Sequence, residues 1–196
     1  MKNNLVTALL MTIATTILLG IIYPLVVTGL AQVLFPRQAN GELIEANGKV
    51  VGSQLIAQAF TGPGYFHPRP SAAGYDPKNS NGSQLSPTNQ KLIDRVKSDV
   101  AADHAENPSV PVPIDLVTAS ASGLDPDITP AAAEFQLDSV AKERAMTLEQ
   151  LRALVARHTV GRQFGILGEP RVNVLELNLE LDHRFPMKKQ AKVSHH

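Results

Sequence analysis

The sequence contains no cysteine among its 196 residues, so the protein cannot form a disulfide bond. A structural zinc site is also disfavoured, because such sites usually draw on cysteine thiolates. The lack of cysteine suits an extracytoplasmic domain without disulfides, and it suits the cytosol equally well. The formal net charge is zero, whereas a nucleic-acid-binding surface needs a basic excess. A disulfide scaffold, a zinc site and a nucleic-acid partner are therefore not expected.

Charged side chains are absent from residues 3–36, which lie between Lys2 and Arg37. About 20 apolar residues in a helix cross the hydrocarbon core of a bilayer. We therefore expect an N-terminal membrane anchor over residues 1–36, with the span at about residues 5–30. The alternative is a cleaved signal peptide, because residues 29–31 resemble a cleavage site. A signal peptide usually has a shorter apolar region behind a more basic start, which favours a retained anchor.

Small side chains recur at every fourth position along the predicted anchor. Positions four apart lie on one slowly drifting face of a helix, and small residues there let a partner helix approach closely. Proline lacks a backbone donor, so Pro24 is expected to kink the last turns. The same spacing also arises by chance, because small residues are common in membrane helices. The predicted partner-helix packing face, called the small-residue ridge, consists of Ala8, Thr12, Thr16, Gly20, Pro24 and Thr28.

The residues after the anchor predict one soluble domain over residues 37–182. Residues 183–196 are interpreted as a polar tail that derives in part from an affinity tag, because it ends in two histidines. Predicted helices and strands both occur in the domain. The expected fold class is α+β, with a single N-terminal transmembrane helix followed by one mixed α/β soluble domain.

Two segments predict strands. Residues 41–51 are expected to form a hairpin, because Asn47-Gly48 is a favoured turn sequence. In residues 172–181, leucine alternates with polar side chains over several positions. This period of two predicts a half-buried strand.

Three segments predict helices. Ser86 followed by proline is typical of a helix start, and an apolar stripe follows it. Thr129 followed by proline repeats this signal and opens an alanine-rich helix to about Ala145. Thr147 and Gln150 form a capping box, which predicts the start of a third helix.

Lysine and arginine are absent from residues 98–141, where the acidic residues are concentrated. A cluster of carboxylates can enrich cations locally, although a solvated helix face is the usual explanation. The acids in or beside predicted loops are Asp115, Asp125 and Asp127, and these are the candidates for cation steering.

Residues that suggest chemistry are few. His67 and Arg69 suit an anion, yet an exposed histidine is more often only solvated. Ser120, Ser122 and Asp125 lie close in sequence, but no Gly-x-Ser-x-Gly motif surrounds either serine. Composition and spacing therefore predict a membrane-anchored, non-catalytic domain without catalytic residues, a metal site or a firmly bound cofactor.

Three blocks of the chain resemble the C subunit of the Kdp-type potassium-transporting P-type ATPase of bacteria. The blocks are residues 52–72, residues 116–130 and residues 172–179. With the anchor, the resemblance extends to about Asp182, and the tail from His183 lies outside the family pattern. The surface formed by the family motifs is assigned to Tyr65, Phe66, His67, Arg69, Ser120, Ser122 and Asp125.

The resemblance implies an accessory subunit of a four-component pump. The other components are a channel-like subunit that selects potassium, a P-type ATPase subunit that hydrolyses ATP, and a very small membrane subunit. The C subunit is expected to support assembly and, as a catalytic chaperone, to raise the ATPase subunit's affinity for ATP. ATP is thus implied only through the ATPase subunit.

The resemblance also implies a single-pass protein of the bacterial inner membrane, in contact with the lipid bilayer. Its N-terminus is expected in the cytoplasm and its soluble domain outside. Charge does not determine this orientation. Lys2 and the N-terminal amine lie on one side of the span and Arg37 and Lys49 on the other, so the basic groups that the positive-inside rule counts are nearly equal on the two sides. A domain outside the membrane cannot touch ATP inside it, so assembly is the favoured role. The alternatives are a membrane-tethered extracytoplasmic enzyme and an anchored binding module.

Overall fold

The computed structural model of the protein describes residues 2–46 and 48–187. The chain divides into two compact units, Met1–Ser53 and Gln54–His196. The predicted hairpin thus belongs to the first unit, together with the anchor. A long apolar helix is followed by a mixed domain of helices and strands, which confirms the predicted α+β class.

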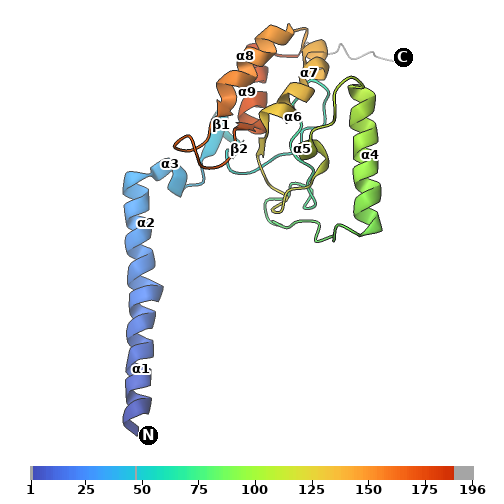
Figure 1. Ribbon diagram of the computed structural model, residues 1–196. Coiled ribbons are helices and arrows are strands. Elements are labelled where there is room, and N and C mark those ends of the chain that lie inside the picture. The colour runs from blue at the N-terminus through green and yellow to red at the C-terminus, as the bar shows by residue number, and fades with distance from the viewer. Residues whose placement is uncertain (1, 47, 188–196) are drawn as a thin grey trace, which may run out of the picture. The chain divides into compact units, whose positions relative to one another are not determined.

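The first unit begins with a continuous helix, Lys2–Leu34, which is blue in Figure 1. The helix has 33 residues, its most apolar 18-residue stretch has a mean hydropathy of 2.4, and none of its residues is buried. A helix of this length and composition is sufficient to cross a bilayer. The finding is consistent with the predicted single-pass membrane protein.

The long helix changes its hydrogen-bond pattern just before Pro24. The segments are α1 (Lys2–Ile17), the π-helix η1 (Leu18–Ile22) and α2 (Tyr23–Leu34). The N–H of Tyr23 donates to the carbonyl of Leu18, five residues back. A proline ring crowds the carbonyl four residues before it, and a π turn loosens the helix at that place. The π turn thus lies before Pro24, and the chain is α-helical from Tyr23 to Leu34; the kink expected in the last turns stays a prediction.

A short helix α3 (Pro36–Ala39) leads into the predicted hairpin, which is confirmed. Strands β1 (Leu43–Ala46) and β2 (Lys49–Ser53) pair antiparallel, with a bulge after Ile44. Gly48 has φ +72°, which suits glycine at a hairpin turn. The preceding turn residue, Asn47, lies outside the described residues.

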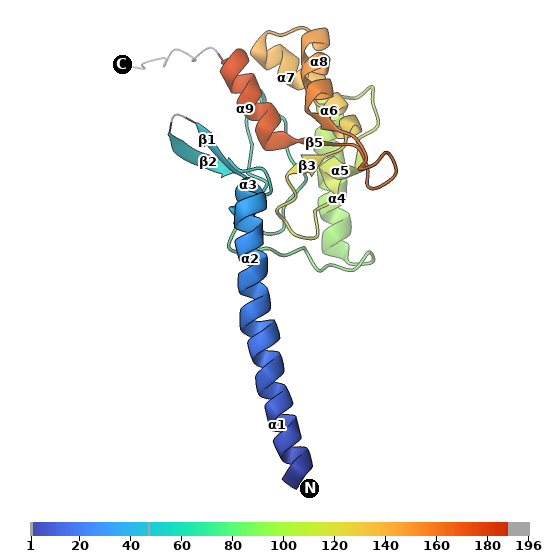
Figure 2. The ribbon, with the colours of Figure 1, turned by 90° about the vertical axis from the view of Figure 1, so that its left-hand side faces the viewer.

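The second unit surrounds a small antiparallel sheet with the strand order β3-β5-β4. Helices α7, α8 and α9 lie side by side in both views (Figures 1 and 2), while α4 lies along one edge of the domain in Figure 1. The strands are β3 (Asp127–Ile128), β4 (Thr159–Val160) and β5 (Arg171–Asn173). The helices are α4 (Gln90–Glu106), α5 (Ile114–Val117), α6 (Pro130–Phe135), α7 (Leu137–Arg144), α8 (Leu148–His158) and α9 (Val174–Arg184).

The core lies between the sheet and helices α6 to α9. Its largest fully buried apolar side chains are Phe66, Ile128, Leu137, Leu151, Leu154, Leu177, Leu181, Val140, Val172 and Val174. Phe185, one residue beyond α9, also packs against this core. Ordered packing therefore continues past Asp182.

The predicted strand over residues 172–181 is wrong for most of its length. Only Arg171–Asn173 is a strand, and α9 follows at once. The side chain of Asn173 caps α9 by accepting the N–H of Glu176 at 3.1 Å. The buried positions of α9 follow a helical spacing and are Val174, Leu175, Leu177, Asn178 and Leu181. Asn178 is polar, so the buried face of the helix is not recognisable as an apolar stripe in the sequence. The alternating leucines therefore suggested a strand.

The predicted helix start at Ser86 is also wrong. Helix α4 begins at Gln90, and the Asn89 side chain caps it by accepting the N–H of Lys91 at 2.9 Å. Ser86 bonds instead to the hydroxyl of Thr88 in the preceding turn. An asparagine cap nearer the apolar stripe thus replaces the serine.

The alanine-rich helix opens at Thr129 as predicted, because the Thr129 side chain accepts the N–H of Ala132. It is divided into α6 and α7 at Gln136, and Ala145 ends it in a left-handed conformation. The capping box of Thr147 and Gln150 is confirmed at the start of α8.

Candidate functional site

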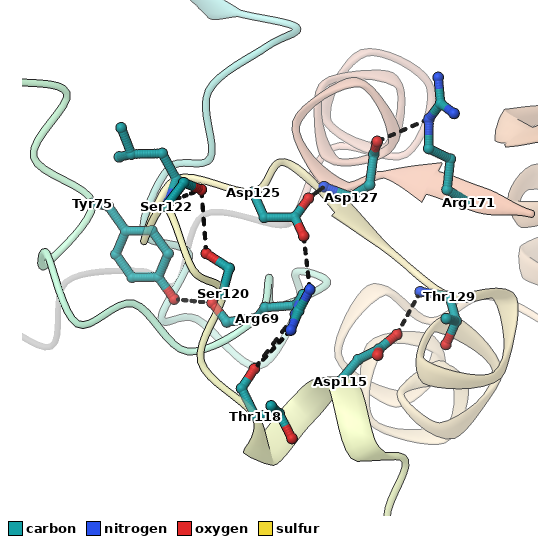
Figure 3. Close-up of polar contacts among 11 residues, drawn as sticks. Arg69, Tyr75, Asp115, Thr118, Ser120, Ser122, Asp125, Asp127, Thr129 and Arg171 are labelled. Atoms are coloured by element: carbon teal, nitrogen blue, oxygen red, sulfur yellow. Dashed lines mark hydrogen bonds and ion pairs between the residues drawn. The ribbon is translucent and has the colours of Figure 1, made fainter. Parts of the chain in front are cut away.

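The family-motif residues lie in two groups in the second unit. The first group connects Arg69 with residues 118–125, as Figure 3 shows. Arg69 Nη1 lies 2.9 Å from Asp125 Oδ2, and the guanidinium also donates to the carbonyl of Thr118 at 3.4 Å. The arginine therefore connects two loops. Because its guanidinium is already paired with Asp125, Arg69 is a weak candidate for anion binding.

The two serines of this group also make internal contacts. The Ser120 and Ser122 hydroxyl oxygens lie 3.5 Å apart, and the Ser122 oxygen accepts the N–H of Leu124 at 3.1 Å. Ser120 is buried. Within the described residues, neither serine hydrogen-bonds to a histidine. An activated serine needs such a base within hydrogen-bond reach, so this arrangement does not favour the enzyme alternative.

The second group contains Phe66 and His67, whose backbones are held by two side-chain amides. Asn178 accepts the N–H of Phe66 at 2.9 Å and donates to its carbonyl at 2.9 Å. Gln136 accepts the N–H of His67 at 2.7 Å and donates to its carbonyl at 3.2 Å. The His67 ring contacts the carbonyl of Gly62 at 3.1 Å. Sequence reasoning missed both amides, because nothing local marks Asn178 or Gln136 as inward-facing.

The buried side chain of Arg144 lies beside Tyr65, and sequence reasoning missed this residue too. The Arg144 side chain is fully buried; its Nη2 lies 2.8 Å from Asp182 Oδ1 and its Nε donates to the Gly64 carbonyl at 2.6 Å. The guanidinium carbon lies 4.7 Å from the centre of the Tyr65 ring, a cation–π distance. The Tyr65 hydroxyl donates to Asp182 at 3.1 Å. Burial first, and then this hydrogen bond, raise the pKa of Tyr65.

The loop carboxylates proposed for cation steering make internal bonds. Asp115 accepts the N–H of Thr129 at 2.8 Å, and Asp127 lies 2.9 Å from Arg171. Asp125 pairs with Arg69 and also accepts the N–H of Asp127. Turns, caps and ion pairs account for all three, and the steering role stays a prediction.

A cavity of about 240 Å³ lies nearby, lined in part by Phe60, His67 and Tyr75. Asp103, Glu106 and Asp138 also line it, and none of them forms an ion pair with another described residue. Burial, followed by Glu106 and Asp99, raises the pKa of Asp103. No group of histidine and carboxylate side chains in residues 2–46 and 48–187 has the geometry of a metal site.

The small-residue ridge lies on the long helix of the first unit. The Thr12 hydroxyl donates to the Ala8 carbonyl at 2.9 Å, so it is already satisfied within the helix. A Cβ added to Gly20 would lie 3.9 Å from Thr16 Cγ2, an ordinary contact. A spacing of four drifts by about 40° per repeat in an α-helix. The π turn over Leu18–Ile22 adds a residue to the turn and rotates the later positions back toward the ridge.

Comparisons with known proteins cover nearly the whole chain. The family model described as "KdpC: K+-transporting ATPase, c chain" matches residues 5–183. The chain is 64% identical over 189 residues to the "Potassium-transporting ATPase KdpC subunit" of Koribacter versatilis, covering 95% of this chain and 98% of that protein. It is 59% identical over 182 residues to the protein of the same name from Acidobacterium capsulatum (92% and 98% covered). The corresponding protein of Rhodospirillum rubrum is 58% identical over 191 residues (95% and 99% covered).

Proposed function

Because this chain belongs to the KdpC family, the c chain of K+-transporting ATPases, we propose that it is a non-catalytic accessory subunit of a high-affinity, ATP-driven potassium import pump. The observation that carries the proposal is the family match over residues 5–183. That range includes the apolar helix and the folded domain, so both parts of the chain serve the same complex.

The proposed partners are the channel-like potassium-selecting subunit, the P-type ATPase subunit and the small membrane subunit. The small-residue ridge is proposed as the contact with their helices, because close packing is what drives helix association in lipid. The apolar composition of the Lys2–Leu34 helix supports this role.

We place the protein in the bacterial inner membrane, with the N-terminus in the cytoplasm and the second unit outside. In this orientation, an effect on the ATPase subunit's affinity for ATP must be transmitted through packed helices. The internally paired Arg69 and the buried Arg144 support this reading, because neither is free to bind nucleotide phosphates. The role in ATP affinity is therefore proposed to be indirect.

The experiment is co-purification of the tagged full-length chain with the two large pump subunits from detergent-solubilised membranes. We expect both subunits to be recovered with the chain, and we expect deletion of the chain to reduce the yield of assembled pump. Recovery of the chain alone, together with unchanged pump assembly after its deletion, would contradict the proposal.

A further inference from the structure

The loop between β4 and β5 presents apolar side chains to solvent. Phe164 is 91% exposed, Ile166 is 74% exposed and Leu167 is about half exposed, as is Val160 at the end of β4, where the loop begins. We call these four residues the apolar tip. Figures 1 and 2 show the loop protruding from the domain. Single exposed apolar residues are common, but four of them within eight residues of the sequence are typical of an interaction site.

The loop that carries the apolar tip has a defined shape. Gln163 and Leu167 exchange two backbone hydrogen bonds of 2.9 Å, and Gly165 N–H donates to the Arg162 carbonyl at 3.1 Å. Across the base, one nitrogen of Arg162 contacts both carboxylate oxygens of Glu169, at 2.8 and 2.6 Å. A loop that is ordered before binding loses less conformational entropy when it binds.

Neither the backbone nor the core accounts for phenylalanine at the tip. Phe164 has φ +53°, a left-handed conformation that glycine or asparagine adopts more easily. The side chain also gains nothing from the core, because it is almost fully exposed. A large apolar side chain in an unfavourable backbone conformation, without burial, indicates a contact outside this chain.

The charges around the apolar tip favour a protein over an anionic bilayer as its partner. Arg162 is paired with Glu169, and Arg171 lies 2.9 Å from Asp127. Arg157, at the end of α8, lies 3.4 Å from Glu180. Attachment to anionic lipid draws on unpaired basic side chains beside the apolar ones. Here Arg162 and Arg171 each have a carboxylate partner, and Arg157 shares Glu180 with His158 and Arg184. Charged side chains that are already engaged in ion pairs suit the polar rim of a protein interface with an apolar centre.

We propose that the apolar tip docks into an apolar pocket on an extramembrane surface of a partner subunit of the pump. This inference rests on the proposed function, and it assigns to the second unit a contact separate from the small-residue ridge. Phe164 and Ile166 supply the buried centre of the contact, and the paired arginines surround it.

The test compares Ile166→Ser with Ile114→Ser in the full-length chain. Ile114 is 73% exposed and lies at the start of α5, so it matches Ile166 in residue type and exposure. We expect Ile166→Ser to bind the pump subunits at least about tenfold more weakly, from the loss of one buried apolar side chain. We expect Ile114→Ser to bind as the wild type does. Phe164→Ser should behave like Ile166→Ser.

The outcomes are distinguishable. Equal recovery of pump subunits with the wild type, Ile166→Ser and Phe164→Ser would overturn this inference and leave the proposed function intact. Failure of the wild-type chain itself to recover any pump subunit, together with unchanged pump assembly after its deletion, would overturn the proposed function, and this inference with it.

A second measurement separates a protein partner from lipid. The chain has no tryptophan, so Phe164→Trp introduces a single tryptophan at the apolar tip, which is excited at a wavelength where the tyrosines do not absorb. The full-length variant is reconstituted alone into anionic phospholipid vesicles that contain brominated acyl chains. We expect no quenching of the tryptophan emission. Strong quenching would place the apolar tip in the bilayer and overturn the proposal of a protein pocket.

Discussion

The side-chain amide of Asn178 hydrogen-bonds to both backbone polar groups of Phe66, accepting its N–H and donating to its carbonyl at 2.9 Å each. The two residues are separated by 112 positions in the chain, and both are buried. An asparagine on α9 thus pairs with the backbone of the family-motif segment as a neighbouring strand would.

We expect Asn178→Ala to reduce the free energy of unfolding by about 2–4 kcal/mol, because it leaves two buried backbone groups unpaired. Urea denaturation of the full-length chain in detergent, followed by circular dichroism, measures the change. Asn79→Ala, at an exposed position, is the control and should have little effect. Equal stability of the two variants would show that water replaces the amide at Phe66.

Arg144 supports the same segment with three nitrogens directed to different acceptors: Asp182, Gly64 and Phe185. An ammonium group cannot reproduce this planar arrangement. We therefore expect Arg144→Lys to destabilise the protein by about 1–3 kcal/mol. Arg152→Lys is the matched control, because Arg152 is half-exposed and pairs only at the surface with Glu134. Thermal melting of both variants compares them, and similar melting temperatures would contradict the structural role of the Arg144 guanidinium.

On the small-residue ridge, we expect Gly20→Leu to weaken assembly with the pump more than Ile17→Leu does. Residue 20 lies in the π-helical segment, where the helix itself has room for a side chain. Any loss therefore arises from separation of the partner helix. The yield of the intact complex in detergent measures the effect. Equal yields from the two variants would show that this face of the helix is not the contact.

Stability should depend on the ionisation of Asp103, which lines the acidic cavity. Burial raises its pKa in the folded protein above the ordinary value of 3.8. The folded state therefore binds the proton more tightly than the unfolded state, so stability falls as pH rises from about 3.8 through the folded pKa. We expect Asp103→Asn to raise the melting temperature at pH 7.

The gain from Asp103→Asn should disappear as the pH falls below about 3.8, because the carboxyl group is then protonated in both states. Asp94→Asn, at an exposed position of the same helix, controls for the change in helix propensity. A gain that is independent of pH, or equal in both variants, would contradict a destabilising charge at Asp103.

Membrane orientation is testable because the chain has no cysteine. Single cysteines at Ser83 and at Asn3 are labelled in intact cells with a membrane-impermeant thiol reagent. We expect labelling at position 83 only, with the second unit outside. Labelling confined to position 3 would reverse the orientation and would make direct contact with ATP physically accessible.

The sequence by itself determined the features that depend on neighbouring residues. The uncharged run determined the apolar helix, and the Thr129 and Thr147 caps determined where α6 and α8 begin. A cap needs only a side chain and a backbone N–H a few positions away, so its signal is local.

Only the tertiary structure decided which polar side chains turn inward. Asn178, Gln136 and Arg144 look like solvent-facing positions in the sequence, yet each one satisfies backbone groups of residues 64–67. The inward Asn178 concealed the helical face of α9, and the Gln136 contact to His67 accompanies the break between α6 and α7. A buried polar group is stable only when its partners are in place, and here the partners lie tens of residues away. No local pattern could therefore identify these residues, although they hold the family-motif segment in its place.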